Sequence, residues 1–112
     1  MSTRSGFSVL LAVALAVSGC APKPAAPAAS AAATQAAALA RSQQLIDAGN
    51  VAFKAGEFEV AAKRYAAASI QNPDDPAAFY GLGMSLAKLG RDEQARVAYA
   101  KARDLNHAQH PQ

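Results

Sequence analysis

The order of hydrophobic and polar residues divides the 112-residue chain into three parts. Residues 7–17, FSVLLAVALAV, are apolar except for Ser8, and residues 21–40 are mostly alanine and proline. From residue 42 onward, apolar and polar positions follow a pattern that occurs twice. The apolar run of eleven residues is too short to cross a bilayer as a helix, which needs about 20 residues. The chain therefore combines a short apolar segment, a linker and a folded region built from repeats.

The repeat consists of residues 42–72 and 76–106, which align without a gap. Nine of the 31 aligned positions are identical. Alanine matches carry little weight in so alanine-rich a sequence, whereas glycine and tyrosine matches rarely arise by chance. The informative matches are Gly49 with Gly83, Gly56 with Gly90, and Tyr65 with Tyr99.

Residues typical of helix ends predict four helices. Gly56 and Gly90 can adopt the left-handed conformation that ends a helix. Asp75 can cap the start of a helix whose first turn contains Pro76. Abundant alanine and the lack of Trp in the sequence favour closely packed helices over strands. We expect an all-α fold with helices near residues 34–55, 57–71, 75–89 and 92–105.

The 34-residue period of the two units and their pattern of small and aromatic residues resemble the tetratricopeptide repeat. In the first unit, Gly49 and Ala68 match small residues of that motif, and Tyr65 matches its aromatic residue. The second unit matches at the equivalent positions. The resemblance covers about 65 residues. It implies two tandem helix-turn-helix units in a short α–α superhelix, residues 42–75 and 76–109.

In the tetratricopeptide family, the first helix of each unit lines a concave face that binds peptides or helices. Carried over to this chain, the resemblance implies a partner-binding groove formed by Ile46, Asn50, Phe53, Lys54, Tyr80, Met84 and Lys88. Aromatic and methionine side chains beside amide and ammonium groups suit a protein or peptide partner. For Phe53 and Tyr80 the alternative is that each completes the core instead.

The N-terminal segment resembles the signal peptide of bacterial lipoproteins. Arg4 precedes the apolar run, and Val17-Ser18-Gly19-Cys20 is similar to the lipobox of that family. Cys20 is the only cysteine of the chain. The resemblance implies cleavage after Gly19 and a covalent lipid on the Cys20 thiol, and we expect no other cofactor. An ordinary cleaved signal peptide is the alternative.

The linker is expected to act as a tether between the lipid and the repeats. Its three prolines, of which Pro27 is the last, fix φ and remove backbone donors, so its first part should be extended. A helix can form from about Thr34. Family knowledge links Ala21, where inner-membrane lipoproteins often have aspartate, with the periplasmic face of the outer membrane. The expected domains are a signal peptide, a lipidated tether, a repeat domain and a tail, at residues 1–19, 20–40, 41–107 and 108–112.

Charge and chemistry argue against several classes of function. Residues 21–112 carry ten Lys and Arg against eight Asp and Glu, interspersed along the chain, so we expect no nucleic-acid partner. His107 and His110 lie in a terminal stretch without a further ligand nearby, so we expect no metal site. We find no catalytic constellation in the sequence and expect no enzyme.

The sequence thus predicts a membrane-anchored protein–protein interaction module in the bacterial cell envelope. By analogy with accessory lipoproteins of the Tad/Flp type, its role would be in assembling a pilus or secretion machine. The alternative is a structural envelope lipoprotein whose repeats associate with one another. Arrays of fewer than about three repeats are usually marginal, so we expect a protein partner or a second copy to complete the surface.

Overall fold

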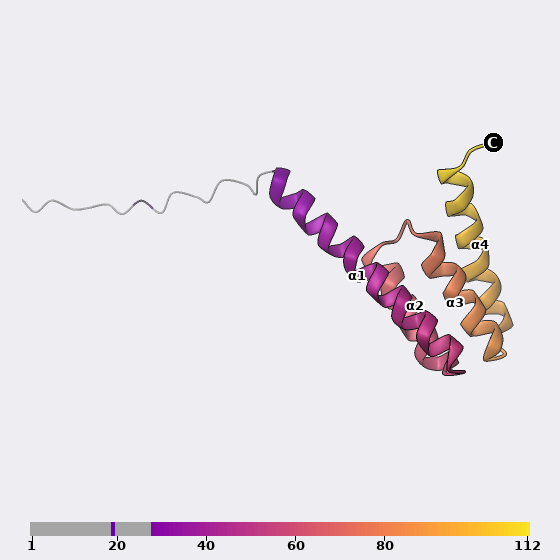
Figure 1. The fold of residues 1–112 in the computed structure, drawn as a ribbon. Helices are drawn as coiled ribbons and strands as arrows, with labels where there is room; N and C mark the ends of the chain where they lie inside the picture. Colours follow the sequence, from indigo (N-terminus) through magenta and orange to yellow (C-terminus); the bar gives the residue numbers. More distant parts are fainter. Residues whose placement is uncertain (1–18, 20–27) are drawn as a thin grey trace, which may run out of the picture.

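The computed structural model describes Gly19 and residues 28–112, which form four helices (Figure 1). They are α1 (Ala28–Lys54), α2 (Phe58–Gln71), α3 (Pro76–Lys88) and α4 (Asp92–Gln109). These residues contain no strand, which confirms the all-α prediction. No helix in the described ranges is apolar over enough residues to cross a membrane. The predicted signal peptide up to residue 18, and residues 20–27 with Cys20, lie outside the described residues.

The helices form two pairs, one from each repeat, that stack side by side (Figure 1). α1 packs against α2, and α3 packs against α4. The main contact between the pairs is that of α2 with α3, and α1 adds a smaller contact with α3. α1 does not touch α4, and the structure describes both helices over their whole length. The first helices of the two repeats are therefore neighbours, with α4 at the far end of the array.

Two helix ends differ from the sequence-based expectation. α1 begins at Ala28, six residues earlier than predicted, because alanine is the best helix former and Pro27 is the last proline before it. α4 continues to Gln109 instead of ending near residue 105. The side-chain nitrogen of Gln109 donates to the carbonyl oxygen of Asp74 at 2.5 Å, which ties the end of α4 to the turn between the repeats. Much of the predicted tether and the first residues of the predicted tail are therefore helical.

The predicted helix caps are confirmed. Gly56 and Gly90 have φ values of 79° and 73°, the left-handed conformation that glycine adopts without strain. The amide after each glycine donates back to the last turn of the helix, at 2.9 Å in both repeats. At the start of α3, the carboxylate of Asp75 accepts from the amide of Ala77 at 2.9 Å, with Pro76 at the first helical position. The two glycines end α1 and α3 at equivalent positions of the two repeats, after Lys54 and Lys88.

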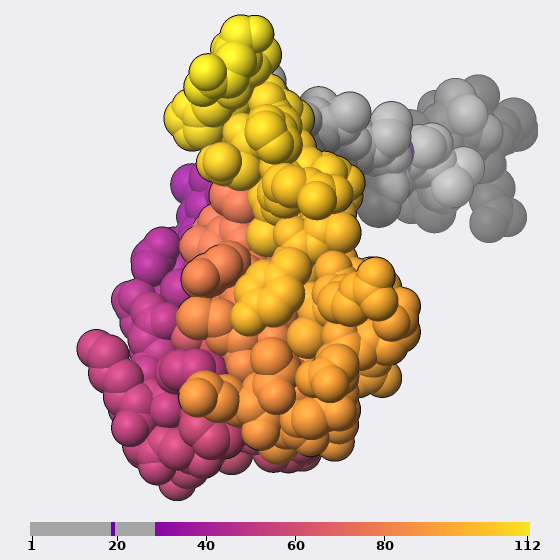
Figure 2. Space-filling model, turned by 90° about the vertical axis from the view of Figure 1, so that its right-hand side faces the viewer, coloured from indigo at the N-terminus to yellow at the C-terminus, as the bar shows by residue number. Residues whose placement is uncertain are grey.

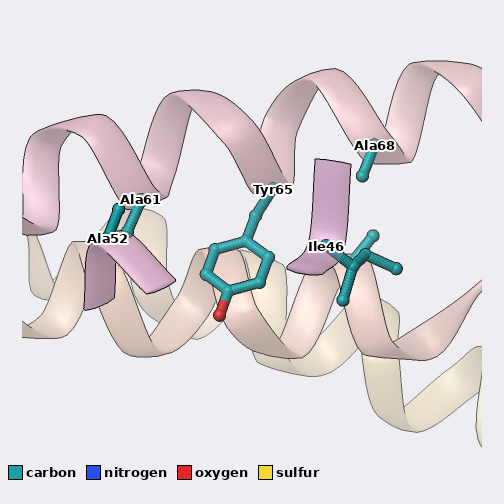
Figure 3. Close-up of a cluster of buried hydrophobic side chains, with 6 residues drawn as sticks. Ile46, Ala52, Ala61, Tyr65 and Ala68 are labelled. Atoms are coloured by element: carbon teal, nitrogen blue, oxygen red, sulfur yellow. The ribbon is translucent and has the colours of Figure 1, made fainter. Parts of the chain in front are cut away.

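Tyr65 of α2 lies at the centre of the hydrophobic core and is only 1% exposed. Figure 3 shows its ring reaching across a cluster of buried residues, with Ala52 and Ala61 on one side and Ile46 and Ala68 on the other. Because most of these neighbours are alanines, the helices can approach the ring closely. The aromatic residue of the repeat motif, Tyr65, thus packs among small residues that include Ala68.

Two glycines bring α1 and α3 against the Tyr65 ring. A Cβ atom on Gly49 of α1 would lie 2.9 Å from this ring, and one on Gly81 of α3 would lie closer still. The ring thus joins three helices, and the Gly81 contact is one that the repeat alignment did not reveal. In the second repeat, a Cβ on Gly83 would lie 2.8 Å from the Tyr99 ring, so the same device joins α3 to α4.

Gly81→Ala is expected to destabilise the fold by about 1–3 kcal/mol, because the added methyl group must displace an enclosed ring or the α3 backbone. The sign is diagnostic, since this substitution within a helix otherwise stabilises by roughly 0.5–1 kcal/mol. Denaturant unfolding followed by circular dichroism measures the difference. Gly83→Ala is the matched control and should destabilise less, because Tyr99 is less enclosed than Tyr65. A Gly81→Ala chain as stable as the wild type would contradict this packing.

Candidate protein-binding site

The residues predicted to form a partner-binding groove all belong to α1 and α3, the neighbouring first helices of the two repeats. α1 contributes four of them, Ile46, Asn50, Phe53 and Lys54, and α3 contributes three, Tyr80, Met84 and Lys88. The structure places these seven side chains in different environments. One is buried, some are engaged in contacts within the fold, and the others are available to a partner.

Ile46 is part of the core and does not line an exposed groove. It is 6% exposed and belongs to the same buried cluster as Ala78 of α3. The prediction carried a motif position over without knowing which helix covers it in three dimensions. At the equivalent position of the second repeat, Tyr80 is 55% exposed, because no further helix of the described chain follows α4.

Asn50 is exposed, but one of its side-chain atoms is already used within the fold. The Tyr65 hydroxyl donates a hydrogen bond to Asn50 Oδ1 at 2.5 Å. This bond satisfies the one polar atom of an otherwise apolar, buried ring. Asn50 therefore supports the core from the surface and keeps its amide hydrogens for other contacts.

The end of α1, the start of α2 and the end of α3 meet in one group of contacts. Its members are Phe53, Phe58 and Lys88. Phe53 is half-buried and packs against the core cluster, and its ring lies edge-on to that of Phe58 at 5.2 Å. Lys88 Nζ lies 6.0 Å from the centre of the Phe58 ring, at the limit of a cation–π contact. Phe53 thus completes the core, as the alternative interpretation held, and still presents part of its ring at the surface.

Two lysines end the neighbouring first helices, Lys54 on α1 and Lys88 on α3. Cations are favoured at this end of a helix by the macrodipole. Within the described residues, neither lysine forms an ion pair. Met84 of α3 is half-buried, so α1 and α3 together offer partly exposed apolar area and two positive charges.

Tyr80 and Tyr99 line an open groove of about 1040 Å³ between α3 and α4. Their ring centres are 5.5 Å apart, with the planes tilted by 58°. Burial, and to a lesser extent the neighbouring Tyr80, raise the pKa of Tyr99 above its usual value. In Figure 2 this end of the array faces the viewer, with α3 in orange and α4 in golden yellow. This groove was not predicted from the sequence. The signal for it is that Tyr80 occupies the position in the second repeat that Ile46 occupies in the first.

The two histidines of the chain lie on the exposed surface near the C-terminus, His107 in α4 and His110 just after it. Over residues 28–112 and Gly19, no group of three or more His, Cys, Asp or Glu side chains is arranged to hold a metal ion.

A comparison with protein families identifies the repeats. The family model described as tetratricopeptide repeat matches residues 46–109, more than half of the chain. The chain belongs to the tetratricopeptide-repeat family. This tetratricopeptide-repeat protein matches no curated protein and no solved structure at a significant level. The family is a non-catalytic interaction fold, and its repeats indicate a protein–protein interaction module.

Replacing Tyr65 by phenylalanine tests the hydrogen bond to Asn50. At neutral pH, Tyr65→Phe is expected to lower the free energy of unfolding by about 1 kcal/mol through loss of this bond. Tyr80→Phe is the matched control, because that side chain lies at the exposed surface, and should change stability little.

The same pair of chains has an expected pH dependence. Burial raises the pKa of Tyr65, so above about pH 10 the unfolded chain loses this proton more readily than the folded one. The contribution of Tyr65 to stability is therefore complete below this pH and declines above it. The difference in unfolding free energy between wild type and Tyr65→Phe should shrink as the pH rises above about 10. A difference that stays constant as the pH rises above this value would argue against a buried hydroxyl.

Proposed function

We propose that this protein is a lipid-anchored tetratricopeptide-repeat module that binds a protein partner in the bacterial cell envelope. The anchor would be a lipid on Cys20, for which the lipobox-like residues 17–20 and the apolar run before them are the support. The location that fits Ala21 is the periplasmic face of the outer membrane. The narrower role, as an assembly or accessory factor of a pilus or secretion machine, rests on analogy with Tad/Flp lipoproteins.

The observation that carries the binding proposal is the surface shared by α1 and α3. It combines the half-buried apolar residues Phe53 and Met84 with the exposed ammonium groups of Lys54 and Lys88. Apolar anchors beside a few charges are what a docking peptide or helix requires. The partner best suited to this surface is a protein segment with apolar side chains and nearby carboxylates.

The anchor is tested by Cys20→Ser in a bacterial host. The wild-type chain is expected to fractionate with membranes and to incorporate labelled palmitate, whereas Cys20→Ser should lose both properties and keep its N-terminal segment. Ser18→Ala is the matched control, since it keeps a small residue in the motif and a thiol at position 20. A wild-type chain that carries no lipid would exclude the anchor.

The binding surface is tested by reversing its charges. Lys54→Glu combined with Lys88→Glu is expected to weaken partner binding at least about tenfold, because carboxylates of the partner would then be repelled. In-cell cross-linking with mass spectrometry identifies the partner, and titration with the purified partner gives the affinity. Lys63→Glu with Arg64→Glu on α2 is the matched control, because both are exposed cations of the first repeat outside α1 and α3. Equal weakening in both double variants would show that this surface is not the binding site.

A further inference from the structure

The two repeats carry the same stacking face, but among the described helices a further helix lies on the first face only. In the first repeat this face consists of residues that are all at most 6% exposed, namely Ser42, Ile46, Ala62, Tyr65 and Ala68. Their counterparts in the second repeat all line the groove between α3 and α4, here called the end groove, namely Pro76, Tyr80, Arg96, Tyr99 and Ala102. The end groove is therefore the position at which a further helix would stack.

The helix that covers the first face shows what an occupant of the second must offer. α3 lies on this face through Ala78 and Gly81, which are three residues apart and both buried. Because these residues are small, the α3 backbone can sit directly on the Tyr65 ring. In the end groove, Tyr99 takes the place of Tyr65, so an occupying helix also needs small residues at a spacing of three.

The chain contains a helical stretch of this kind, and none of the other described helices lies beside it. Residues 29–40 of α1, here called the overhang, extend beyond α2 and are exposed except for half-buried Ala38 (Figure 1). Eight of these twelve residues are alanine and none is charged. The overhang presents alanine pairs three residues apart along its length, such as Ala29 with Ala32 and Ala33 with Ala36. It also carries Leu39, which is 43% exposed.

We propose that the overhang of one copy of this chain docks in the end groove of a second copy. There it covers the second repeat on the side on which α3 covers the first, and its alanine Cβ atoms hold its backbone farther from the Tyr99 ring than Gly81 holds α3 from the Tyr65 ring. The partner must be a second copy, because α1 and α4 of one chain, both fully described, do not touch. Docking buries exposed apolar area of Tyr80 and Val97, which is 65% exposed, against methyl groups of the overhang.

The charged residues beside the end groove are already paired within the chain. Arg96 forms an ion pair with Glu93, which also lines the groove, and Arg103 forms one with Asp104. The uncharged overhang adds no charge next to these exposed pairs. The groove is also separate from Lys54, Met84 and Lys88, which do not line it.

Docking of this kind produces either a closed or an open assembly, and both follow from the proposal. If each copy inserts its overhang into the other, the assembly closes as a dimer. If insertion runs one way, copies add head to tail and the assembly grows with concentration. In either case the contact joins residues 29–40 of one chain to α3 and α4 of another.

Site-specific photo-cross-linking of the full-length chain in bacterial cells tests the contact. Tyr80 is replaced by the photo-reactive benzoylphenylalanine, which preserves an aromatic side chain. The expected product has the mass of two chains, and its cross-linked peptide contains residues 29–40 of the second copy. Ile70 of α2, which is 77% exposed and outside the groove, is the control position and should give little of this product. Cross-links to α4 of a second copy, to a different protein alone, or to nothing would each overturn the proposal.

Association itself is measured with two differently tagged copies that are co-precipitated from the same cells. Tyr80→Lys should reduce co-precipitation at least tenfold, because it places a charge where the overhang would lie. Ile70→Lys introduces the same charge at a more exposed residue and should leave co-precipitation unchanged. Circular dichroism of both variants confirms that the helices are retained. Equal co-precipitation by Tyr80→Lys and wild type would overturn the proposal, whatever the Lys54 and Lys88 variants show for the partner.

Discussion

The packing of one tyrosine ring against two glycines is the constraint on which this fold depends. Tyr65 touches Gly49 in its own repeat and Gly81 in the next, and its hydroxyl is satisfied by Asn50. One side chain of α2 thereby fixes the distance to α1 and to α3, so pairing within a repeat and stacking between repeats have the same origin. The spacing of glycine and tyrosine that the two units share follows from this geometry, since a larger residue at either glycine would push the helices apart.

The core compensates for small side chains by close approach. Eight of the eleven buried hydrophobic residues in the described chain are alanine, and each buries far less apolar area than a leucine would. Stability must therefore come from short helix–helix distances and from well-capped ends such as those at Gly56, Gly90 and Asp75. In such a fold, each face that a neighbouring helix covers adds a large share of the buried apolar area. The open face at Tyr80 and Tyr99 leaves that share unburied.

Local sequence signals predicted the helices and most of their ends. They did not predict which side chains are covered by a helix that is distant in the sequence. Glycines suited to positive φ, the Asp75 cap and the repeat period predicted four helices with boundaries close to those observed. The early start of α1 was missed because the linker was interpreted as a tether, although alanine propensity alone favours a helix after Pro27. Ile46 was wrongly assigned to the binding surface because its exposure depends on α3, which is distant from it in the sequence.

The overhang connects the anchoring proposal with self-association. It lies in the sequence between Cys20 and the repeats, so a lipid on that cysteine would hold the overhang and the end groove of every copy at one membrane surface. Confinement of this kind raises the effective concentration of binding elements, and a contact made mostly by alanine methyl groups then need not be strong. The surface formed by Phe53, Lys54, Met84 and Lys88 would stay accessible in such an assembly, because none of these residues lines the end groove. Apart from Tyr80, which lines the end groove and is also among the predicted partner-binding residues, association between copies and recognition of a partner would use separate parts of the same two repeats.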